Sequence, residues 1–381
     1  MNKLIVATIV GTRPEIIRLS YTIKLLDQYV RQILIHTGQN YDYELNEIFF
    51  KELGLRKPDY YLAVDTSSLG RVYGETLIKT EQVLLKEKPD AVLILGDTNS
   101  SIAAIIAKRL RIPIFHMEAG NRCFDMNVPE EINRRIIDHI ADFNLVYTEH
   151  ARRHLLSEGL PHRRIYLTGS PLFEVLQEHR EQIKASTILQ QLDLTDKGYF
   201  LVSAHREENV DNRRHLTQIL TILNRLAESY QLPVIVSTHP RTRKRLEALE
   251  MPTHEWIRFL KPFGFFDYVH LQQHARCTLS DSGTISEESA ILSFPAISLR
   301  QSMERPEAQD AGTILLTGLE PDIVLNAVEA VIREFEERRF AHVPPDYRIA
   351  DTSWRVLKLI LGNAKLSNGW WGIKADHDQS S

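Results

Sequence analysis

Short apolar runs alternate with longer amphipathic stretches along the chain, and this alternation predicts the fold. The runs that predict strands are residues 4–10, 33–36, 91–95, 112–116 and 145–147 in the first half and 199–203, 234–238, 257–260, 278–280 and 296–299 in the second. Helical patterns separate most of these runs. Because strands that are almost entirely apolar are typical of parallel sheets covered by helices on both faces, the sequence predicts an α/β protein with two Rossmann-like halves.

Turn-forming residues mark the boundary between the two halves. Residues 168–171 read Thr-Gly-Ser-Pro, so we expect one domain over 1–170 and a second over 171–352, although a helical pattern over 172–183 follows directly. The remaining residues, 353–381, contain an amphipathic stretch and two adjacent tryptophans. Because tryptophans are rarely left exposed, we expect this segment to cross back onto the first domain.

Composition limits the partners that the chain can bind. It has 381 residues, with 46 Lys and Arg against 50 Asp and Glu and a formal net charge of −4. This length fits about two domains, each large enough to bury its own core. Nucleic acid is not expected as a partner, because it requires a concentrated basic surface and no stretch of the sequence concentrates Lys and Arg. Anionic small molecules remain compatible with the composition.

Cysteine usage and hydropathy indicate the compartment. Cys123 and Cys277 are far apart and lack the paired spacing of a zinc or redox motif, which indicates a reduced, metal-free protein. The N-terminal apolar run is only about seven residues long, and no cleavage site typical of a signal peptide follows it. No run of about 18 apolar residues occurs, so no membrane span is expected. We therefore expect a cytoplasmic protein.

Ligands of open parallel sheets bind at the carboxyl ends of the strands, so the residues after each strand are candidates for function. The first strand ends in Gly11-Thr12-Arg13-Pro14-Glu15, where Pro14 suits the first turn of a helix whose N-terminus attracts anions. Arg13 is a candidate for bidentate phosphate binding, and a plain turn with a surface arginine is the alternative. No G-x-G-x-x-G fingerprint follows an expected strand, so a dinucleotide redox cofactor is disfavoured and no cofactor is expected.

Three acidic residues follow strands of the first half or begin a helix there. Asp97 follows strand 91–95, Glu118 follows strand 112–116, and Glu130 lies at the start of a helical pattern. Each has an ordinary alternative, because Asp97 suits a helix cap and Glu130 suits the positive end of a helix dipole. Three acids near one edge of a sheet nevertheless favour general acid/base chemistry over three independent structural roles.

The second half carries polar loops at equivalent places. His205 and Arg206 follow the strand 199–203, and His239 follows the strand 234–238. These side chains are candidates to face a pyrophosphate, and solvated loop ends are the alternative.

A third polar loop begins a helix in the second half. Ser282, Gly283 and Thr284 place backbone N–H groups where a phosphate can bind, and a capping box is the competing interpretation. Glu288 lies one turn further on and is a candidate to bind a ribose diol. Tyr268 belongs to an aromatic stretch that is more often core, and it is a candidate wall of a base pocket.

These motifs resemble those of the non-hydrolysing UDP-N-acetylglucosamine 2-epimerases, a family with two Rossmann-like domains in the glycosyltransferase-B arrangement. The matching motifs cover nearly the whole chain: GTRPE at 11–15, GDTNS at 96–100, HMEAGNR at 116–122, PEEINR at 129–134, TGSP at 168–171, HREEN at 205–209, DSGTISEE at 281–288 and ERPEA at 304–308. The resemblance implies a UDP-sugar held between the two domains, with UDP mainly on the second, and it suggests a homodimer.

The resemblance also implies roles for individual residues. Asp97, Glu118 and Glu130 correspond to the catalytic acids of the family, and Arg13 and His205 to its diphosphate contacts. Ser282, Gly283 and Thr284 are implied to hold the β-phosphate, and Glu288 the ribose. Further candidate contacts to the substrate or to UDP are Arg18, Arg206, His239, Tyr268 and Arg305.

The chemistry of the family explains why such groups are needed. The C2 hydrogen of a hexosamine has no adjacent carbonyl, so its direct removal leaves an unstabilised carbanion. Departure of UDP gives C1 oxocarbenium character, and elimination then yields a glycal that is protonated from the other face as UDP adds back. Such a site needs cations and N–H groups at the diphosphate and carboxylates near C2, and domain closure keeps water out.

Several positions depart from the common UDP-N-acetylglucosamine enzymes. Arg18 replaces the usual lysine, the family's HRRE and DSGG read HREE and DSGT, and the loop 121–129 is shorter. HMEAGNRCFD, NVPEEINR, THPR and LKPFGFFDY look like the branch that makes UDP-N-acetyl-L-fucosamine for capsule or O-antigen (lipopolysaccharide) biosynthesis. We therefore expect epimerisation of UDP-2-acetamido-2,6-dideoxy-β-L-talose, and interconversion of UDP-GlcNAc and UDP-ManNAc is the alternative.

Residues 39–43 differ from the Gln-His-Arg of bacterial enzymes that UDP-GlcNAc activates allosterically, so no such activation is expected. A glycosyltransferase-B enzyme is an alternative of another class and would need an acceptor site. A non-catalytic nucleotide-sugar binding protein would be expected to lack the acids, which are present. A hydrolysing epimerase is excluded by the resemblance alone.

Overall fold

The chain folds as two parallel α/β units. The computed structural model describes residues 3–38, 49–238, 240–249, 251–337 and 343–367. The first unit comprises the residues up to 177 together with those from 348, and the second comprises residues 178–347. These limits lie a few residues from the expected boundaries at 170/171 and 352/353. The fold class expected from the sequence is confirmed.

The first unit is built on a seven-stranded parallel sheet with the strand order β3-β2-β1-β4-β5-β6-β7. Its strands are β1 (Ile5–Val10), β2 (Arg31–His36), β3 (Tyr60–Tyr61), β4 (Ala91–Leu95), β5 (Ile114–Ala119), β6 (Phe143–Val146) and β7 (Ile165–Leu167). Its helices are α1 (Arg13–Tyr29), α3 (Leu69–Glu87), α4 (Ala103–Arg109), α5 (Pro129–Ile140), α6 (Glu149–Ser157), α7 (Leu172–Glu178, at the limit of the unit) and α17 (Thr352–Asn363), with 3₁₀ turns η1 (Asn99–Ile102) and η2 (His162–Arg164).

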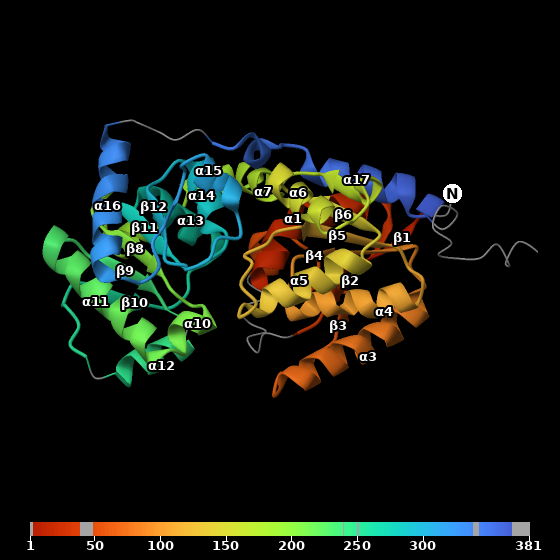
Figure 1. Cartoon of the computed structure of the whole chain (residues 1–381), viewed down its shortest axis with the longest axis horizontal. Coiled ribbons are helices and arrows are strands. Elements are labelled where there is room, and N and C mark those ends of the chain that lie inside the picture. Colours follow the sequence, from red (N-terminus) through yellow and green to blue (C-terminus); the bar gives the residue numbers. More distant parts are fainter. Residues whose placement is uncertain (1–2, 39–48, 239, 250, 338–342, 368–381) are drawn as a thin grey trace, which may run out of the picture. The chain divides into compact units, whose positions relative to one another are not determined.

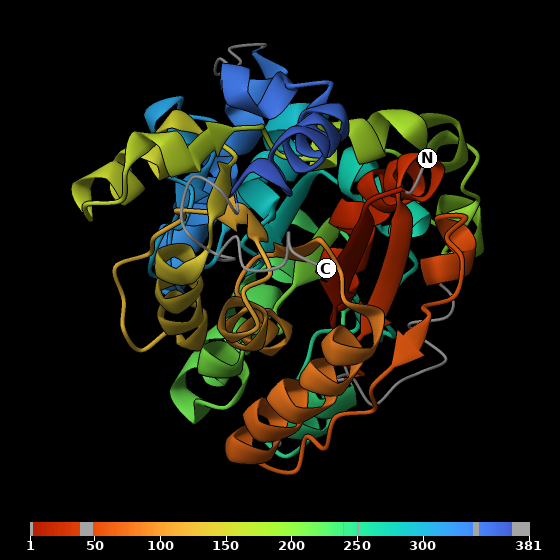
Figure 2. The same cartoon turned by 90° about the vertical axis from the view of Figure 1, so that its right-hand side faces the viewer.

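Helices cover both faces of this sheet, as the apolar strands require. Figures 1 and 2 show α3 and α4 on one side of the sheet and α1 on the other. Ala7 and Ile9 of β1 pack in one buried cluster with residues of α3 and α4, while Val6 between them is equally buried. Because successive residues of a strand face opposite sides, burial of all three explains why β1 is apolar along its length.

The C-terminal helix α17 belongs to the first unit and packs against α1. The hydroxyl groups of Thr22 and Ser353 lie 2.9 Å apart, and the Thr352 hydroxyl donates to the carbonyl of Thr168 at 3.0 Å. The Glu174 carboxylate accepts the Ser353 N–H and hydroxyl at 3.0 and 2.7 Å. These buried hydrogen bonds fasten the returning segment.

The second unit has a six-stranded parallel sheet with the order β10-β9-β8-β11-β12-β13. Its strands are β8 (Phe200–Ser203), β9 (Val234–Ser237), β10 (Ile257–Leu260), β11 (Cys277–Ser280), β12 (Ala296–Ser298) and β13 (Leu315–Leu316). Its helices are α8 (Arg180–Lys184), α9 (Ile188–Gln191), α10 (Glu207–Val210), α11 (Arg213–Tyr230), α12 (Pro240–Glu247), α13 (Phe265–His274), α14 (Ile285–Leu292), α15 (Pro306–Asp310) and α16 (Pro321–Glu336), followed by the 3₁₀ turn η3 (Pro345–Arg348).

Strand β8 shows how the second core is divided. Phe200 and Val202 pack with α11 and α16, whereas Leu201 packs with α9 and α13 on the other face. Each of the ten strands expected from the sequence coincides with an observed strand, with ends that differ by at most three residues. The helical stretch expected over 172–183 is confirmed, but it forms two helices, because α7 and α8 are separated at His179 near the limit of the two units.

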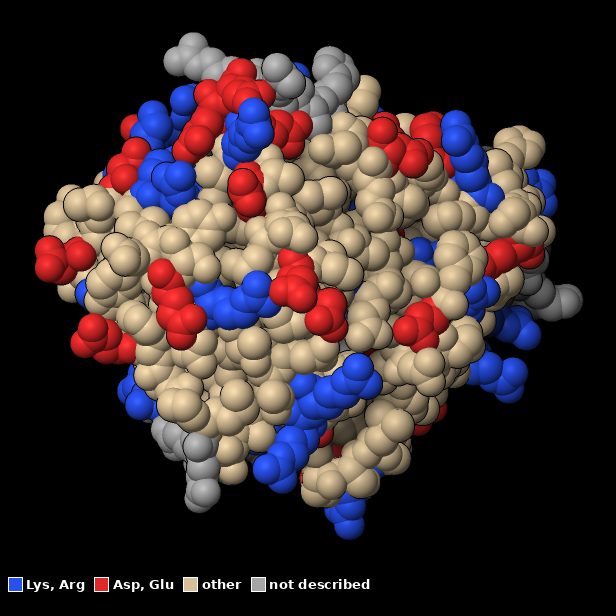
Figure 3. All heavy atoms as spheres, turned by 60° about the vertical axis from the view of Figure 1, so that its left-hand side comes forward, with Lys and Arg blue, Asp and Glu red and all other residues tan. Residues whose placement is uncertain are grey.

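The surface carries charges of both signs. On the face shown in Figure 3, Lys and Arg are interspersed with Asp and Glu. No helix among the described residues is long and apolar enough to cross a membrane.

Candidate active site

The loop after β1 is fixed by a buried carboxylate. Glu15 accepts the N–H groups of Gly11 and Thr12 at 2.5 and 2.9 Å. Its other oxygen accepts the hydroxyl groups of Thr98 and Ser100 at 2.5 and 2.8 Å. Burial raises the pKa of Glu15, and these four hydrogen bonds oppose the shift. Glu15 thus ties the loop of Arg13 to the loop that follows β4.

Arg13 begins α1, as the sequence predicts. Its guanidinium carbon lies 5.4 Å from the centroid of the Phe49 ring, within the range of a cation–π interaction. The ring therefore supports the cation at the N-terminal end of a helix, where the helix dipole also favours anions.

Two of the three expected acids are joined by an arginine that the sequence reasoning missed. Arg134 of α5 donates to the carbonyl oxygen of Glu118 at 2.6 Å and also contacts the Asp97 carboxylate. Its guanidinium lies 3.5 Å from Glu118 Oε1. Asp97 and Glu118 are both buried, so the structure brings these predicted acids to one cationic group.

Arg18 pairs with Glu118 from α1, whereas Arg134 reaches it from α5. Arg18 is 3% exposed and forms an ion pair with the Glu118 carboxylate. Its guanidinium carbon lies 5.7 Å from the centroid of the Tyr147 ring, next to the end of β6. Two guanidinium groups beside one carboxylate favour its ionised form.

Glu118 has a backbone conformation that is unusual for a residue in a β-strand. Its φ angle is +61°, in the left-handed region that non-glycine residues rarely adopt. The pairing of β5 with β6 shifts between Met117 and Ala119, as in a β-bulge. Bulges re-aim side chains next to active sites, and here β5 extends to Ala119, beyond the expected end at residue 116.

The adjacent acids at the start of α5 have different environments. Glu131 is 2% exposed, accepts the Cys123 N–H at 3.0 Å, and pairs with Arg135 at 2.8 Å. Glu130 is only half-buried and makes no hydrogen bond or ion pair with the part of the chain that the structure describes. The structure therefore engages Glu131 in buried contacts and leaves Glu130 partly exposed to solvent.

In the second unit, Asp281 organises the loop that carries His205. This fully buried carboxylate accepts the N–H groups of His205 and Arg206 at 3.1 and 3.0 Å and the Asn209 side chain at 3.0 Å. The Nδ1 atom of His205 lies 3.3 Å from it, and the His205 side chain is half-exposed. The imidazole is therefore anchored at Nδ1 and accessible elsewhere.

The loop before α14 is stabilised by hydrogen bonds between its own residues. The Ser282 N–H donates to the Ser280 hydroxyl at 3.1 Å, and the Thr284 N–H donates to the Ser282 hydroxyl at 3.3 Å. Thr284 precedes α14 without a side-chain cap, so the capping-box interpretation was wrong. Gly283 lies beneath charged groups: a Cβ there would be 3.1 Å from Glu304 Oε2 and 3.2 Å from Arg300 Nη1.

Two arginines meet one carboxylate above Gly283. Arg300 donates to Glu304 at 2.6 Å, and Arg206 lies 3.5 Å from the same oxygen. Arg305 is 2% exposed and instead donates to the Gly283 carbonyl at 3.0 Å, with Glu287 at 3.3 Å. Arg305 therefore stabilises the loop before α14 through the backbone of Gly283.

Both oxygens of the Glu288 carboxylate are held by side chains of the second unit. It accepts the Thr284 hydroxyl and the Gln272 side chain, each at 2.6 Å. Tyr268 is half-buried nearby, and burial together with Glu288 raises the pKa of its hydroxyl, opposed by hydrogen bonds to Ser203 and Ser280. Phe263 and Tyr268 pack on the α9–α13 core, so part of the aromatic stretch is core.

His239 and residues 39–43 lie outside the described residues. Two missed residues had signals in the sequence. Arg134 is four residues after Glu130 on one helix, so both occupy the same face. Arg300 lies two residues after β12, at the edge of the sheet that the strand-end rule singles out.

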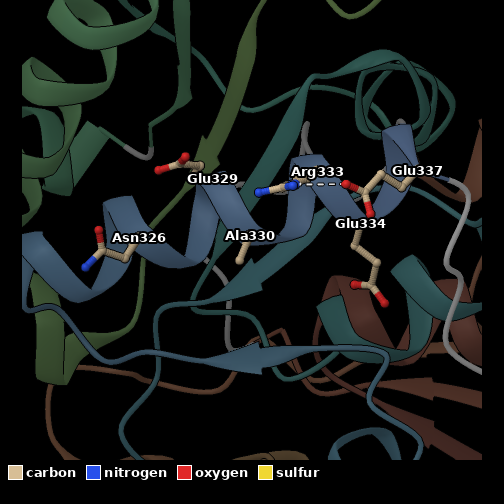
Figure 4. A pocket seen from close by; sticks show the side chains of 6 residues that line it. All are labelled: Asn326, Glu329, Ala330, Arg333, Glu334 and Glu337. Atoms are coloured by element: carbon tan, nitrogen blue, oxygen red, sulfur yellow. Dashed lines mark hydrogen bonds and ion pairs between the residues drawn. The ribbon is translucent and has the colours of Figure 1, made fainter.

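A surface hollow on α16 contains none of these residues. Figure 4 shows Asn326, Glu329, Ala330, Arg333, Glu334 and Glu337 around it, all from one helix. Arg333 pairs with Glu337 at 2.8 Å within the helix, so the hollow has the character of a solvated helix face.

Two parallel α/β units with acids at the strand ends of one and with arginines and hydroxyl groups at a helix start of the other are typical of enzymes that act on nucleotide-linked sugars. The sequence profile of the UDP-N-acetylglucosamine 2-epimerase family matches residues 25–361. The chain belongs to this family, which makes it an isomerase of the UDP-sugar 2-epimerase class.

Several relatives support this assignment. A UDP-N-acetylglucosamine 2-epimerase structure from Rickettsia bellii is 48% identical, covers 98% of this chain and 100% of that chain, and has a TM-score of 0.91. A Methanocaldococcus jannaschii UDP-GlcNAc 2-epimerase structure, in complex with UDP-GlcNAc and UDP, is 35% identical with a TM-score of 0.88 and covers 94% of this chain and 100% of that chain. A UDP-2,3-diacetamido-2,3-dideoxy-D-glucuronate 2-epimerase from Pseudomonas aeruginosa is 34% identical over 326 residues, 84% of this chain and 90% of that protein.

Proposed function

We propose that this enzyme inverts C2 of a UDP-linked 2-acetamido sugar by eliminating UDP and adding it back. The observation that carries the proposal is the cluster of Asp97, Glu118 and Arg134 at the strand ends of the first unit. A C2 epimerase needs carboxylates that exchange protons with carbon, held in fixed positions. The buried ion pairs provide such positioning.

The reaction balances without a cofactor. A carboxylate takes the proton from C2, and the C2–H electron pair forms the C1=C2 bond. The C1–O bond breaks, and its electrons remain on the β-phosphate oxygen of UDP. Addition reverses these steps, with a proton delivered to the opposite face of C2. The glycal and UDP are the intermediates of this proposal.

The acids have different parts in this scheme. Arg18 and Arg134 flank the Glu118 carboxylate and hold it in place, and Glu118 enters the proposed reaction as a base. Glu130 makes no ion pair with the described residues, and in this proposal it is the second acid that exchanges a proton with C2. Asp97 is held by Arg134 and completes the set.

The second unit supplies the nucleotide contacts in this proposal. His205 and Arg206 stabilise the negative charge that develops on the departing diphosphate. The segment of Ser282, Gly283 and Thr284 holds the β-phosphate, and Glu288 accepts the hydroxyl groups of the ribose. Arg13 of the first unit adds a cation to the diphosphate.

The preferred substrate is UDP-2-acetamido-2,6-dideoxy-β-L-talose, which gives UDP-N-acetyl-L-fucosamine for polysaccharide biosynthesis. The motifs HMEAGNRCFD and LKPFGFFDY and the short loop 121–129 support this choice. UDP-GlcNAc is the second candidate, because relatives with that substrate in their names are up to 48% identical.

The test is to incubate the purified enzyme with each substrate in D2O and to follow C2 by NMR. We expect epimerisation and C2 deuteration of the L-talo compound. Exchange on UDP-GlcNAc with none on the L-talo compound would assign the second candidate. Free sugar with UDP would indicate hydrolysis, and turnover only with an acceptor would indicate a glycosyltransferase. In the same assay, added UDP-GlcNAc is expected not to raise the rate of epimerisation. Gel filtration of the purified enzyme tests the expected homodimer.

A further inference from the structure

One buried histidine contacts two of the three segments that carry the acids and lies on the third. His116 lies on β5, two residues before Glu118, and is 0% exposed. Its Nε2 atom is 2.8 Å from the carbonyl oxygen of Gly96, the residue before Asp97. Its Nδ1 atom is 2.9 Å from Oδ1 of Asp138 on α5, the helix that begins with Glu130.

His116 lies between two acceptor groups. A carbonyl oxygen only accepts hydrogen bonds, so the Nε2–H group of His116 donates to Gly96. Nδ1 lies within ion-pair distance of the Asp138 carboxylate, so the side chain bridges the two segments. Burial alone would raise the pKa of Asp138, but His116 and Arg122 outweigh it, and the pKa is lowered.

Asp138 is also paired with an arginine. Arg122 donates to Asp138 Oδ2 at 2.7 Å and pairs with Glu158 at 2.7 Å. Glu158 in turn lies 3.1 Å from Arg135, so Asp138 belongs to a network that contains two arginines. Buried charges persist when they are paired in this way.

This network holds the bulge that aims Glu118. Asp138 Oδ2 accepts the Gly120 N–H at 3.1 Å, and Arg134, one turn before Asp138 on α5, donates to the Glu118 carbonyl at 2.6 Å. Helix α5 therefore holds the strained backbone of Glu118 from both sides. Strained residues of this kind persist only where their surroundings fix them.

We propose that His116 is a positioning residue, which sets the separations between Asp97, Glu118 and Glu130 by linking Gly96 to Asp138. It has no contact with solvent and acts only through these partners. The proposal rests on the C2 epimerase function proposed above.

The experiment compares His116→Leu and His116→Gln with the wild-type enzyme. Leucine removes both contacts, while the glutamine amide can still donate to the Gly96 carbonyl. Because a misplacement of about 1 Å can cost about 10²-fold in rate, we expect His116→Leu to lower kcat by about ten- to a hundredfold, with His116→Gln in between. KM and the affinity for UDP should change less than about threefold, because the proposed UDP contacts, Arg13 apart, lie in the second unit and none of them touches His116.

A second readout separates positioning from simple destabilisation. Misaligned acids reprotonate the glycal slowly, so the variants should release more free UDP and glycal per epimerisation event than the wild-type enzyme. The matched control is His36→Leu, which changes a buried histidine on β2 whose side chain, among the described residues, contacts Gly38, Phe50 and Tyr61 and none of the acid-bearing segments. It should lower Tm without changing the share of glycal released.

Each outcome decides the question. Wild-type kcat and glycal release in folded His116→Leu would overturn the positioning role. If His116→Leu does not fold, His116→Gln decides in the same way, and equal kcat with the wild type overturns the proposal. A wild-type enzyme that fails to exchange C2 with any substrate would instead overturn the proposed function.

Discussion

Arg134→Met removes the cation that joins Asp97 to Glu118, and its cost can be worked from the structure. Arg134 is 2% exposed and donates to the Glu118 carbonyl and the Asp97 carboxylate. Breaking a buried ion pair from one side costs about 3–5 kcal/mol, because the remaining charge loses the opposite charge that compensated its burial. At about 2–4 °C per kcal/mol, the unit should lose about 6–20 °C in Tm.

The assay measures pairwise coupling as well as stability. Thermal unfolding is followed with and without UDP, which should stabilise the second unit and separate its transition from that of the first. Adding Asp97→Asn to Arg134→Met replaces the carboxylate that paired with Arg134 by a neutral amide and should restore about 1–3 kcal/mol. Arg109→Met, at an exposed arginine on α4, is the control and should change stability by about 0.5 kcal/mol at most. A wild-type Tm for Arg134→Met, or strictly additive losses in the double variant, would refute the assigned pairing.

Three further predictions follow from the site and its surroundings. Glu130→Gln should lower kcat by about 10²-fold or more at unchanged Tm, whereas Glu131→Gln should mainly lower Tm; parallel losses in both variants would contradict the division of roles. Gly283→Ala should weaken UDP binding about tenfold by calorimetry, because its Cβ meets Glu304 and Arg300 at 3.1 and 3.2 Å; an unchanged Kd argues against a phosphate site there. Burial raises the pKa of Glu307, so its contribution to stability is present at low pH and is lost as pH rises through that pKa. Glu307→Gln does not titrate, so its Tm relative to wild type should be higher at pH 8 than at pH 5, and the reverse order would show that the sign is wrong.

Hydrophobic periodicity was sufficient to predict the longer strands but only one of the four edge strands, β10. Most of the ten expected strands are buried and apolar, so their pattern records contact with helices on both faces. The missed strands β3, β7 and β13 have only two or three residues each and lie at sheet edges. Such short segments show no alternation, because pairing with a single neighbour defines them.

The strand-end rule identified the acids but not the groups that control them. Asp97 and Glu118 were predicted because both follow apolar strands. Their link through Arg134 depends on the rotation of α5 and on the bulge at Glu118, and neither is encoded in a local pattern. The contacts of His116 were missed for the same reason. A histidine inside an apolar strand does not indicate which carbonyl and which carboxylate its ring nitrogens will contact.

The arrangement of charge explains why one acid differs from the others. Asp97 and Glu118 carry two negative charges, and Arg18 and Arg134 carry two positive charges beside them. This balance lets two acids be buried together, but it also favours their ionised forms. A reaction that moves protons between the two faces of C2 needs at least one acid that can be protonated without leaving a buried arginine unpaired. Glu130, half-buried and without an ion pair among the described residues, meets that requirement. In the proposed reaction, the arginines therefore fix the positions of Asp97 and Glu118, and Glu130 is the acid assigned to proton exchange.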